Sequence, residues 1–103
     1  MPSSVDRVRS GDAQISYRVA GDGPPVVLLH PFPANHELWL PVAEQLEPRY
    51  QLILPDLRGH GDSEAGDGPA TVEKHAADIA RVMDDTNVGR APMIGVSLSL
   101  IHI

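Results

Sequence analysis

Cysteine is absent from this chain of 103 residues. Its absence excludes a disulfide scaffold, a zinc–thiolate site and a cysteine nucleophile, and it fits the cytoplasmic location that we expect. Cations are scarce as well, because 8 lysine and arginine residues stand against 14 aspartate and glutamate residues, for a formal net charge of −6. A surface that binds nucleic acid needs a basic face, so we expect no nucleic-acid partner.

Long apolar runs are missing too. No stretch of the sequence approaches the roughly 18 apolar residues of a membrane span, and the polar first residues lack the apolar core of a secretory signal. We therefore expect no membrane segment and no signal peptide. With 42% hydrophobic and 21% charged residues, the composition is that of a single globular domain. The 10 prolines and 9 glycines separate the apolar segments, which indicates short elements joined by sharp turns.

Apolar segments of strand length predict five strands. Val5–Arg9 and Ala13–Val19 flank the turn residues Gly11 and Asp12, and the alternation in the second segment is typical of a hairpin with one solvated face. Three later runs are continuously apolar: Pro25–His30, Tyr50–Pro55 and Ala91–Val96. Continuous runs of this kind favour parallel strands that are buried on both faces.

Two helices are predicted between these strands. The first is marked by apolar residues at helical spacing, which are Leu38, Trp39, Val42, Ala43 and Leu46. The second covers about Thr71 to Asp85, with Thr71 as its N-cap and Asn87 and Gly89 as its stop. Its predicted apolar face is Val72, Ala76, Ile79, Val82 and Met83. The order β-β-β-α-β-α-β indicates an α/β fold in which an antiparallel hairpin precedes parallel strands with crossover helices.

Ser97 is the candidate nucleophile. It follows the last apolar run in the segment Gly95-Val96-Ser97-Leu98-Ser99. A serine at a strand-to-helix turn can be forced to expose its hydroxyl above the sheet, and this turn needs small residues two positions before and after the serine. Gly95 meets the first requirement, whereas Ser99 only approximates the second. Taken alone, the segment is equally compatible with a serine that caps a helix.

The loop after the first buried run is rich in proline. Its residues His30-Pro31-Phe32-Pro33 leave Phe32 and Ala34 as the available backbone N–H donors, because proline has none. A rigid loop of this kind could supply an oxyanion-hole donor. A plain proline-rich turn is the alternative interpretation.

Charged residues flanked by glycine follow the second buried run, in the loop from Asp56 to Ser63. We interpret Asp56, Arg58 and His60 as a structural polar network, and we expect the polar groups of Asp56 and Arg58 to be satisfied within the loop. His60 is expected to face the mouth of the active site, and a catalytic role for it stays open. His36 and His75 are expected on exposed helix surfaces. No cluster of residues has metal-ligand spacing.

Together these motifs resemble the α/β-hydrolase superfamily. The resemblance rests on a strand that ends in His-Pro-Phe, a helix led by Trp39, and the loop of the form D-x-R-G-H-G-x-S, all in the stretch PPVVLLHPFPANHELWLPVAEQLEPRYQLILPDLRGHGDSE. It extends from about Gly11 to Ser97. It implies Ser97 as the nucleophile, the backbone N–H groups of Phe32 and Leu98 as the oxyanion pair, and a structural or pocket-lining role for Arg58 and His60. It also implies a small-molecule acyl substrate, such as an ester or lactone, and no cofactor.

The family's triad continues with an acid and a histidine after the nucleophile. The sequence ends six residues after Ser97, so we expect residues 1–103 to be a partial α/β-hydrolase domain that is inactive by itself. Residues 98–103 can be back-translated as CTG TCT CTT ATA CAC ATC, which resembles a transposon end used as a sequencing adapter. Our hypothesis is that this tail is not native, and a divergent native ending is the alternative.

Two other classes of protein remain as alternatives to a hydrolase. One is a small non-catalytic α/β module that binds a ligand or partner at the strand ends. The other is a receiver-like or flavodoxin-like domain, although a receiver needs an acidic cluster after its first strand and none is present. In the hydrolase interpretation, the strand Ala91–Val96 pairs with Pro25–His30 and leaves an open apolar edge. Self-association through this edge is then expected.

Overall fold

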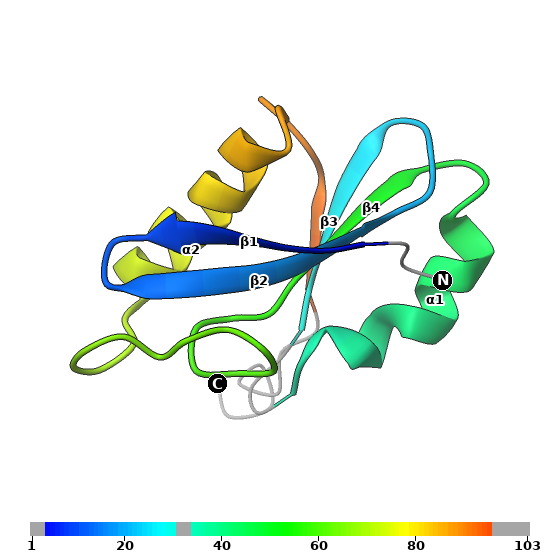
Figure 1. The fold of residues 1–103 in the computed structure, drawn as a ribbon. Coiled ribbons are helices and arrows are strands. Elements are labelled where there is room, and N and C mark those ends of the chain that lie inside the picture. The colour runs from blue at the N-terminus through cyan, green and yellow to red at the C-terminus, as the bar shows by residue number, and fades with distance from the viewer. Residues whose placement is uncertain (1–3, 31–33, 96–103) are drawn as a thin grey trace, which may run out of the picture.

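The computed structural model describes residues 4–30 and 34–95, and their elements follow the predicted order (Figure 1). The strands are β1 (Ser4–Ser10), β2 (Ala13–Ala20), β3 (Pro25–Leu29), β4 (Gln51–Pro55) and β5 (Met93–Gly95). The helices are the 3-10 turn η1 (His36–Trp39), α1 (Leu40–Leu46) and α2 (Val72–Asp85). None of these helices is long and apolar enough to cross a membrane. The predicted α/β class is confirmed.

The five strands form one mixed sheet in the order β1-β2-β4-β3-β5. β1 and β2 are an antiparallel hairpin around Gly11 and Asp12, as the sequence predicts, and Gly11 has the positive φ of 58° that this tight turn requires. β3 runs parallel to both β4 and β5. The sequence did not indicate where the hairpin would lie, and the structure places β2 antiparallel to β4.

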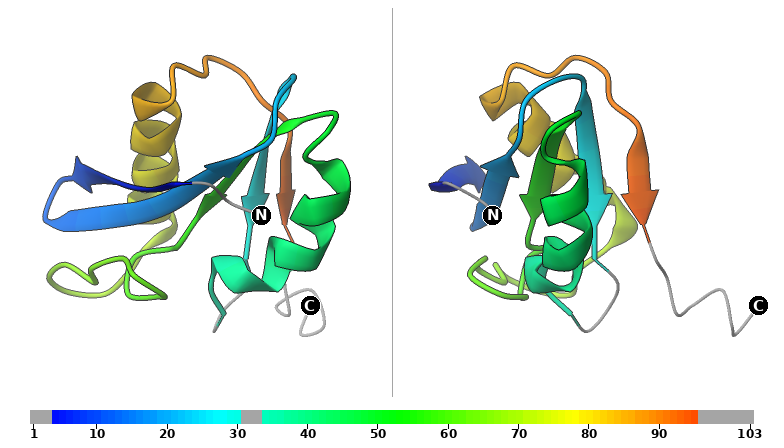
Figure 2. Two further views of the ribbon diagram at one scale, coloured as in Figure 1. Left: turned by 45° about the vertical axis from the view of Figure 1, so that its right-hand side comes forward. Right: turned by 90° about the vertical axis from the view of Figure 1, so that its right-hand side faces the viewer.

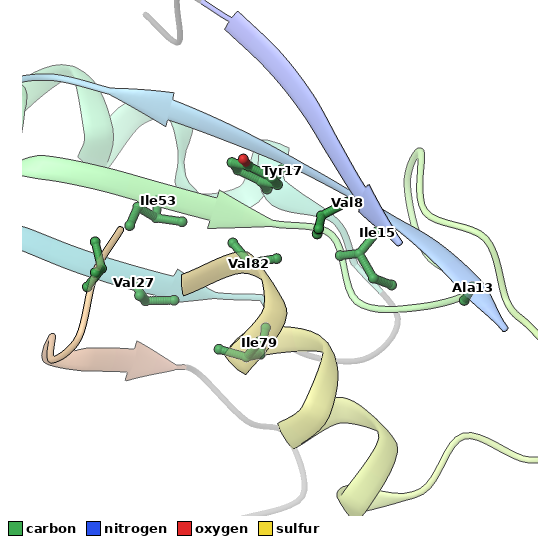
Figure 3. Packing of buried hydrophobic residues seen from close by; sticks show 9 residues of the cluster. Val8, Ala13, Ile15, Tyr17, Val27, Ile53, Ile79 and Val82 are labelled. Atoms are coloured by element: carbon green, nitrogen blue, oxygen red, sulfur yellow. The ribbon is translucent and has the colours of Figure 1, made fainter. Parts of the chain in front are cut away.

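The sheet has one helix on each face, with α1 on one side and α2 on the other (Figure 2). Neighbouring residues of β3 and β4 point to opposite faces, so each face has its own core. The α2 face buries Val8, Ala13, Ile15, Tyr17, Val27, Ile53, Ile79, Val82 and Val88, most of which are seen in Figure 3. The α1 face buries Val26, Leu28, Trp39, Ala43, Leu52 and Leu54. The predicted burial of β3 and β4 on both faces is therefore confirmed.

The buried face of the first helix differs from the prediction. Trp39 and Ala43 are buried, but Leu38 is 49% exposed and Val42 is 40% exposed. The reason is that the helix begins with a 3-10 turn, which has three residues per turn rather than 3.6. Its residues are therefore out of phase with the single α-helical stripe that the sequence pattern predicted.

The buried face of α2 is also rotated from its predicted position. Val72 is 80% exposed and Ala76 is exposed, whereas Asp78 is almost fully buried beside the predicted Ile79 and Val82. The helix turns Asp78 inward because Arg58 binds its carboxylate beneath the helix. An ion pair thus sets the orientation that hydrophobic spacing alone misassigned.

Both ends of α2 are capped. At the N-terminus the Thr71 side chain accepts a hydrogen bond from the Lys74 backbone N–H at 3.1 Å, which confirms the predicted cap. At the C-terminus Asn87 takes the left-handed conformation, with φ of 59°. The N–H of Val88 then bonds the Met83 carbonyl at 2.8 Å, the arrangement of a Schellman motif. Asn87 alone fills the left-handed position, and Gly89 is not needed for it.

β5 pairs with β3, as predicted, and forms an edge of the sheet within the described residues (Figure 2). The prediction that this run is buried on both faces is wrong for these residues, because Met93 is 49% exposed and Ile94 is 47% exposed. The short strand lies beyond the part of the sheet that the two helices cover. Self-association through this edge stays a prediction.

Candidate functional site

The carboxyl ends of β3, β4 and β5 lie at the same end of the sheet, because the three strands are parallel (Figure 2). The loops that leave these strands therefore define the candidate site. The predicted site residues Ser97, Phe32 and Leu98 lie outside the described residues, as do the other residues of the 98–103 tail. Their roles stay predictions, and the structure describes the residues that surround the strand ends.

The loop after β4 folds back against β2. Within the loop, the His60 N–H donates to the Leu57 carbonyl at 2.9 Å and the Ser63 N–H donates to the His60 carbonyl at 3.0 Å. The Ser63 hydroxyl donates to the Asp56 carbonyl at 2.7 Å and accepts from the Ser16 backbone N–H of β2 at 2.8 Å. These bonds hold the loop as a compact unit against the sheet.

Asp56 is fully buried at the start of this loop, and its contacts define the Asp56 cluster, which comprises Arg18, His36, Asp56 and Asp62. Its Oδ1 accepts from the backbone N–H of His36 at 2.7 Å and lies 2.8 Å from the His36 ring Nδ1. Its Oδ2 accepts from the Asp62 N–H at 3.1 Å and lies 3.7 Å from Arg18 Nη1. Arg18 also bonds the Asp62 carboxylate at 3.0 Å, and this bond is the main cause of the lowered pKa of Asp62.

Arg58 lies two residues further along the loop and is the centre of the Arg58 cluster, which comprises Asp12, Arg58 and Asp78. Its Nε and Nη2 each bond the buried Asp78 carboxylate at 2.8 Å, and its Nη1 bonds Asp12 at 3.0 Å. The bond to Asp78 is the main cause of the raised pKa of Arg58. The pKa of Asp12 falls to about 2, first because it accepts from the Asp67 backbone N–H and then because of Arg58.

The expectation that the polar groups of Asp56 and Arg58 are satisfied within the loop is wrong. Arg58 binds residues of the hairpin turn and of α2, and Asp56 binds η1 and β2 as well as one loop N–H. Both side chains are buried, so a loop of this length cannot fold over them and supply every partner. They also belong to two separate clusters rather than to the single predicted network with His60.

His30 and His60 lie next to each other at the strand ends. The buried His30 accepts a hydrogen bond on Nε2 from the Leu57 backbone N–H at 2.9 Å. The His60 ring is 5.4 Å from the His30 ring, centre to centre, and its Nδ1 donates to the Arg58 carbonyl at 3.0 Å. His60 therefore lies beside His30 at the strand ends, held by the backbone of its own loop, and its orientation toward the mouth of an active site stays a prediction.

The expectation that His36 and His75 lie on exposed helix surfaces is wrong. His36 is only 5% exposed, because η1 turns it toward Asp56. His75 is half-buried on the inner side of α2, and burial is the main cause of its lowered pKa. A sequence pattern predicts that polar side chains on a helix face solvent. Only the tertiary structure shows which of them have partners beneath the helix.

Gly95 was expected to permit a close backbone approach at the end of β5. Among the described residues, a Cβ at this position would meet Leu29 at an ordinary contact distance of 3.7 Å. The contact with Leu29 therefore does not require glycine at position 95. The predicted turn after Gly95 lies outside the described residues.

Sequence reasoning missed two partners, His36 and Asp78. Asp78 adjoins Ile79 in the apolar stripe of α2, and an acid so close to a buried face needs a basic partner. That signal could have been used to predict that Asp78 pairs with Arg58. No comparable signal marked His36. Within residues 4–30 and 34–95, no group of three or more histidine and acidic side chains is placed to hold a metal ion.

Comparisons with known proteins agree with this fold. The sequence profile of the alpha/beta hydrolase fold matches residues 24–98. The pimeloyl-[acyl-carrier protein] methyl ester esterase of Xanthomonas oryzae pv. oryzae is 42% identical over 62 residues, which cover 60% of this chain and 24% of the esterase. The fluoroacetate dehalogenase of Burkholderia sp is 45% identical over 53 residues, or 52% of this chain and 17% of the dehalogenase. The crystal structure of an alpha/beta hydrolase from Sphaerobacter thermophilus DSM 20745 superposes with a TM-score of 0.79 at 35% identity, over 87% of this chain and 35% of that chain.

The chain belongs to the alpha/beta hydrolase fold family, and the predicted resemblance is confirmed. The relatives it matches include an esterase and a dehalogenase by name. The chain spans about a third or less of the length of these relatives.

Proposed function

We propose that this chain is the N-terminal part of a serine hydrolase that cleaves an ester, a lactone or a similar acyl substrate. The observation that carries the proposal is the parallel pairing of β3 and β5, in which Leu29 lies opposite Gly95. Phe32 follows Leu29 by three residues, and Ser97 follows Gly95 by two. The two strands therefore lead toward the same end of the sheet, where a nucleophile and an oxyanion donor must meet.

The proposed chemistry is acyl transfer. The Ser97 hydroxyl attacks the carbonyl carbon of the substrate and gives its proton to a histidine base, which a carboxylate orients. The backbone N–H groups of Phe32 and Leu98 stabilise the oxyanion that forms. Collapse of this intermediate releases the alcohol, which takes the proton from the histidine, and water then hydrolyses the acyl-enzyme by the reverse sequence. The histidine and the carboxylate come from residues after the nucleophile, so residues 1–103 alone should be inactive.

The esterase among the relatives supports an acyl substrate. The similarity to a fluoroacetate dehalogenase favours a second candidate, displacement of a halide. Ser97 counts against this candidate, because dehalogenating members of the superfamily typically use aspartate at the nucleophile position. The two candidates therefore differ in the expected products, which are a carboxylic acid and an alcohol from an ester for the first, and glycolate and fluoride from fluoroacetate for the second.

The test uses the full-length enzyme and its Ser97→Ala variant. With p-nitrophenyl acetate as the probe, the variant should lose at least about a thousandfold in kcat, because triad members act as a unit. A fluorophosphonate should label Ser97, as seen by peptide mass spectrometry, and should not label the variant. Retention of esterase activity by Ser97→Ala would overturn the proposal, and release of fluoride from fluoroacetate without ester cleavage would favour the dehalogenase instead. Loss of activity in His60→Ala, with folding and substrate affinity intact, would assign the catalytic role to His60.

A further inference from the structure

The two halves of α2 differ in how they are held against the rest of the chain. Within the described part of the chain, the buried side chains of α2 are Asp78, Ile79 and Val82, none of which precedes residue 78. Its first residue, Val72, is 80% exposed. The contact that holds the first turns is therefore the Asp78 carboxylate, which accepts two hydrogen bonds of 2.8 Å from Arg58. A segment held in this way opens more readily than the core of the sheet.

His75 lies in this N-terminal half of the helix, three residues before Asp78. Residues three apart on a helix are neighbours, so His75 shares the face on which Arg58 binds Asp78. The ring is half-buried, and its Nδ1 is shielded from water. It interacts electrostatically with Asp78 on its own helix and with Arg58 and His60 on the loop after β4. These four residues are called the α2–loop contact below.

Charged and titratable groups of three further segments adjoin this contact. Arg58 also bonds Asp12 of the hairpin turn at 3.0 Å, and the His60 ring lies 5.4 Å from the ring of His30 at the end of β3. The Lys74 ammonium bonds two carbonyls of the segment before α2, at 2.8 Å and 3.1 Å. A proton on the neighbouring histidine of α2 would therefore add a second full positive charge to a contact whose four residues include one carboxylate.

The surroundings of His75 disfavour this added charge. Burial of the ring is the main cause of its lowered pKa, and the charges of Arg58 and His60 act in the same direction. His75 is also the fourth residue of α2, close to the positive end of the helix dipole. Asp78 acts in the opposite direction, but Arg58 already binds both of its carboxylate oxygens. The neutral ring thus fits the contact better than the protonated ring does.

We propose that the α2–loop contact is an acid-sensitive switch: protonation of His75 releases the N-terminal half of α2 from the loop after β4, while Ile79 and Val82 keep the rest of the helix on the sheet. The N-terminal half of α2 lies at the same end of the sheet as the carboxyl ends of β3 and β5 (Figure 2). The switch therefore acts beside the candidate site, and it needs neither Ser97 nor the acyl reaction.

The direction of the pH dependence follows from the two protonation equilibria of His75. In the closed contact its pKa lies below the ordinary value of 6.5, so the released form binds the proton first as the pH falls. The closed form is fully favoured above about pH 6.5, and this preference declines at lower pH. A single proton changes the ratio of released to closed forms by at most about tenfold per pH unit.

Hydrogen exchange of the full-length enzyme, followed by mass spectrometry, tests the switch. Each exchange rate is divided by the intrinsic rate at the same pH, which gives a protection factor. Between about pH 7 and about pH 5.5, the protection of residues 75–78 should fall about threefold to eightfold. Residues 83–85 of the same helix should change by less than about twofold, because that half stays on the sheet. They are the internal control for unfolding of the whole chain.

His75→Gln is the variant that removes the switch, and His60→Gln is its matched control in the same contact. Glutamine keeps a polar side chain but has no group that titrates in this pH range, so His75→Gln should abolish the pH dependence of residues 75–78. His60→Gln should keep it, since burial of His75 is the main cause of the effect. The wild-type measurement needs no substitution, so the switch stays testable if a variant fails to fold.

Three results would overturn the switch. In the wild type, residues 75–78 could keep their protection down to about pH 5.5, or residues 83–85 could lose as much protection as residues 75–78. The third result is that His75→Gln keeps the pH dependence, which would assign it to another group, and to His60 if His60→Gln abolishes it. None of these results bears on the nucleophile, because labelling of Ser97 tests that assignment separately.

Discussion

Asp56 and Arg58 are separated by one residue in the same loop, yet they are held in opposite ways. Arg58 is a buried cation that donates two hydrogen bonds of 2.8 Å to the buried Asp78 carboxylate. Asp56 is a buried anion that is held mainly by N–H groups, because Arg18, its cationic neighbour, is 3.7 Å away. Each cluster contains one arginine and two aspartates, and the Asp56 cluster also contains His36.

The two clusters connect the loop to different parts of the molecule. The Arg58 cluster joins the loop to the hairpin turn and to α2, and it lies on the face with the larger core. The Asp56 cluster joins the loop to η1, next to the segment that carries the proposed oxyanion donor. We therefore expect substitutions in the Arg58 cluster to change mainly the free energy of unfolding.

The largest expected effect is that of Arg58→Met. The substitution leaves the Asp78 carboxylate buried without its partner, and breaking a buried pair in this way costs about 3–5 kcal/mol. Urea unfolding of the full-length enzyme, followed by circular dichroism, measures the change.

The double variant Arg58→Met with Asp78→Leu sharpens this prediction. It removes both charges, so much of the lost stability should return. A double variant as unstable as Arg58→Met would show that packing of the arginine side chain, rather than its charge, stabilises this region.

The next effect compares two glycines, one beside each cluster. Gly61→Ala would force a Cβ to 2.5 Å from the fully buried Asp56 carboxylate, at a φ of 51°. Gly66→Ala, at a φ of 72°, would bring a Cβ to 2.8 Å from Asp12, whose side chain is 40% exposed and can move aside, and to 2.9 Å from Arg58 Nη1, which is the far end of a long side chain. Both should lose about 1–2 kcal/mol to the left-handed backbone, and Gly61→Ala a further 1–3 kcal/mol, roughly, to crowding.

Thermal unfolding of the two variants measures this difference. Equal melting temperatures for the two variants would contradict the contrast between the clusters.

The smallest effect is on the acid side of the pH–stability curve. The pKa of Asp12 is lowered from 3.8 to about 2 in the folded chain, so the unfolded chain binds its proton first as the pH falls. The stabilisation is therefore complete above about pH 3.8 and is lost as the pH falls toward 2. Asp12→Asn should reduce the slope of the unfolding free energy against pH in this window. Arg58→Met should reduce it only in part, because the Asp67 N–H is the main cause of the shift; an unchanged slope in Asp12→Asn would contradict the assignment.

Several features of the fold were correctly predicted from short stretches of sequence. The turn at Gly11, the cap at Thr71 and the helix stop at Asn87 each depend on residues within a few positions of one another. The continuous apolar runs correctly located the strands β3 and β4. Their order with the helices was enough to predict the α/β class, and the resemblance to the α/β-hydrolase superfamily predicted the pairing of β3 with β5.

The sequence by itself thus determined the elements, their order and the family resemblance, because local hydrogen bonds and side-chain periodicity need only neighbouring residues. Only the tertiary structure decided that His36 binds Asp56 and that Arg58 binds Asp78, pairs that are each 20 residues apart. It also decided which face of α2 is buried. A buried charge takes whichever opposite charge or N–H the packed elements bring within about 3 Å. That choice depends on how the helices lie against the sheet.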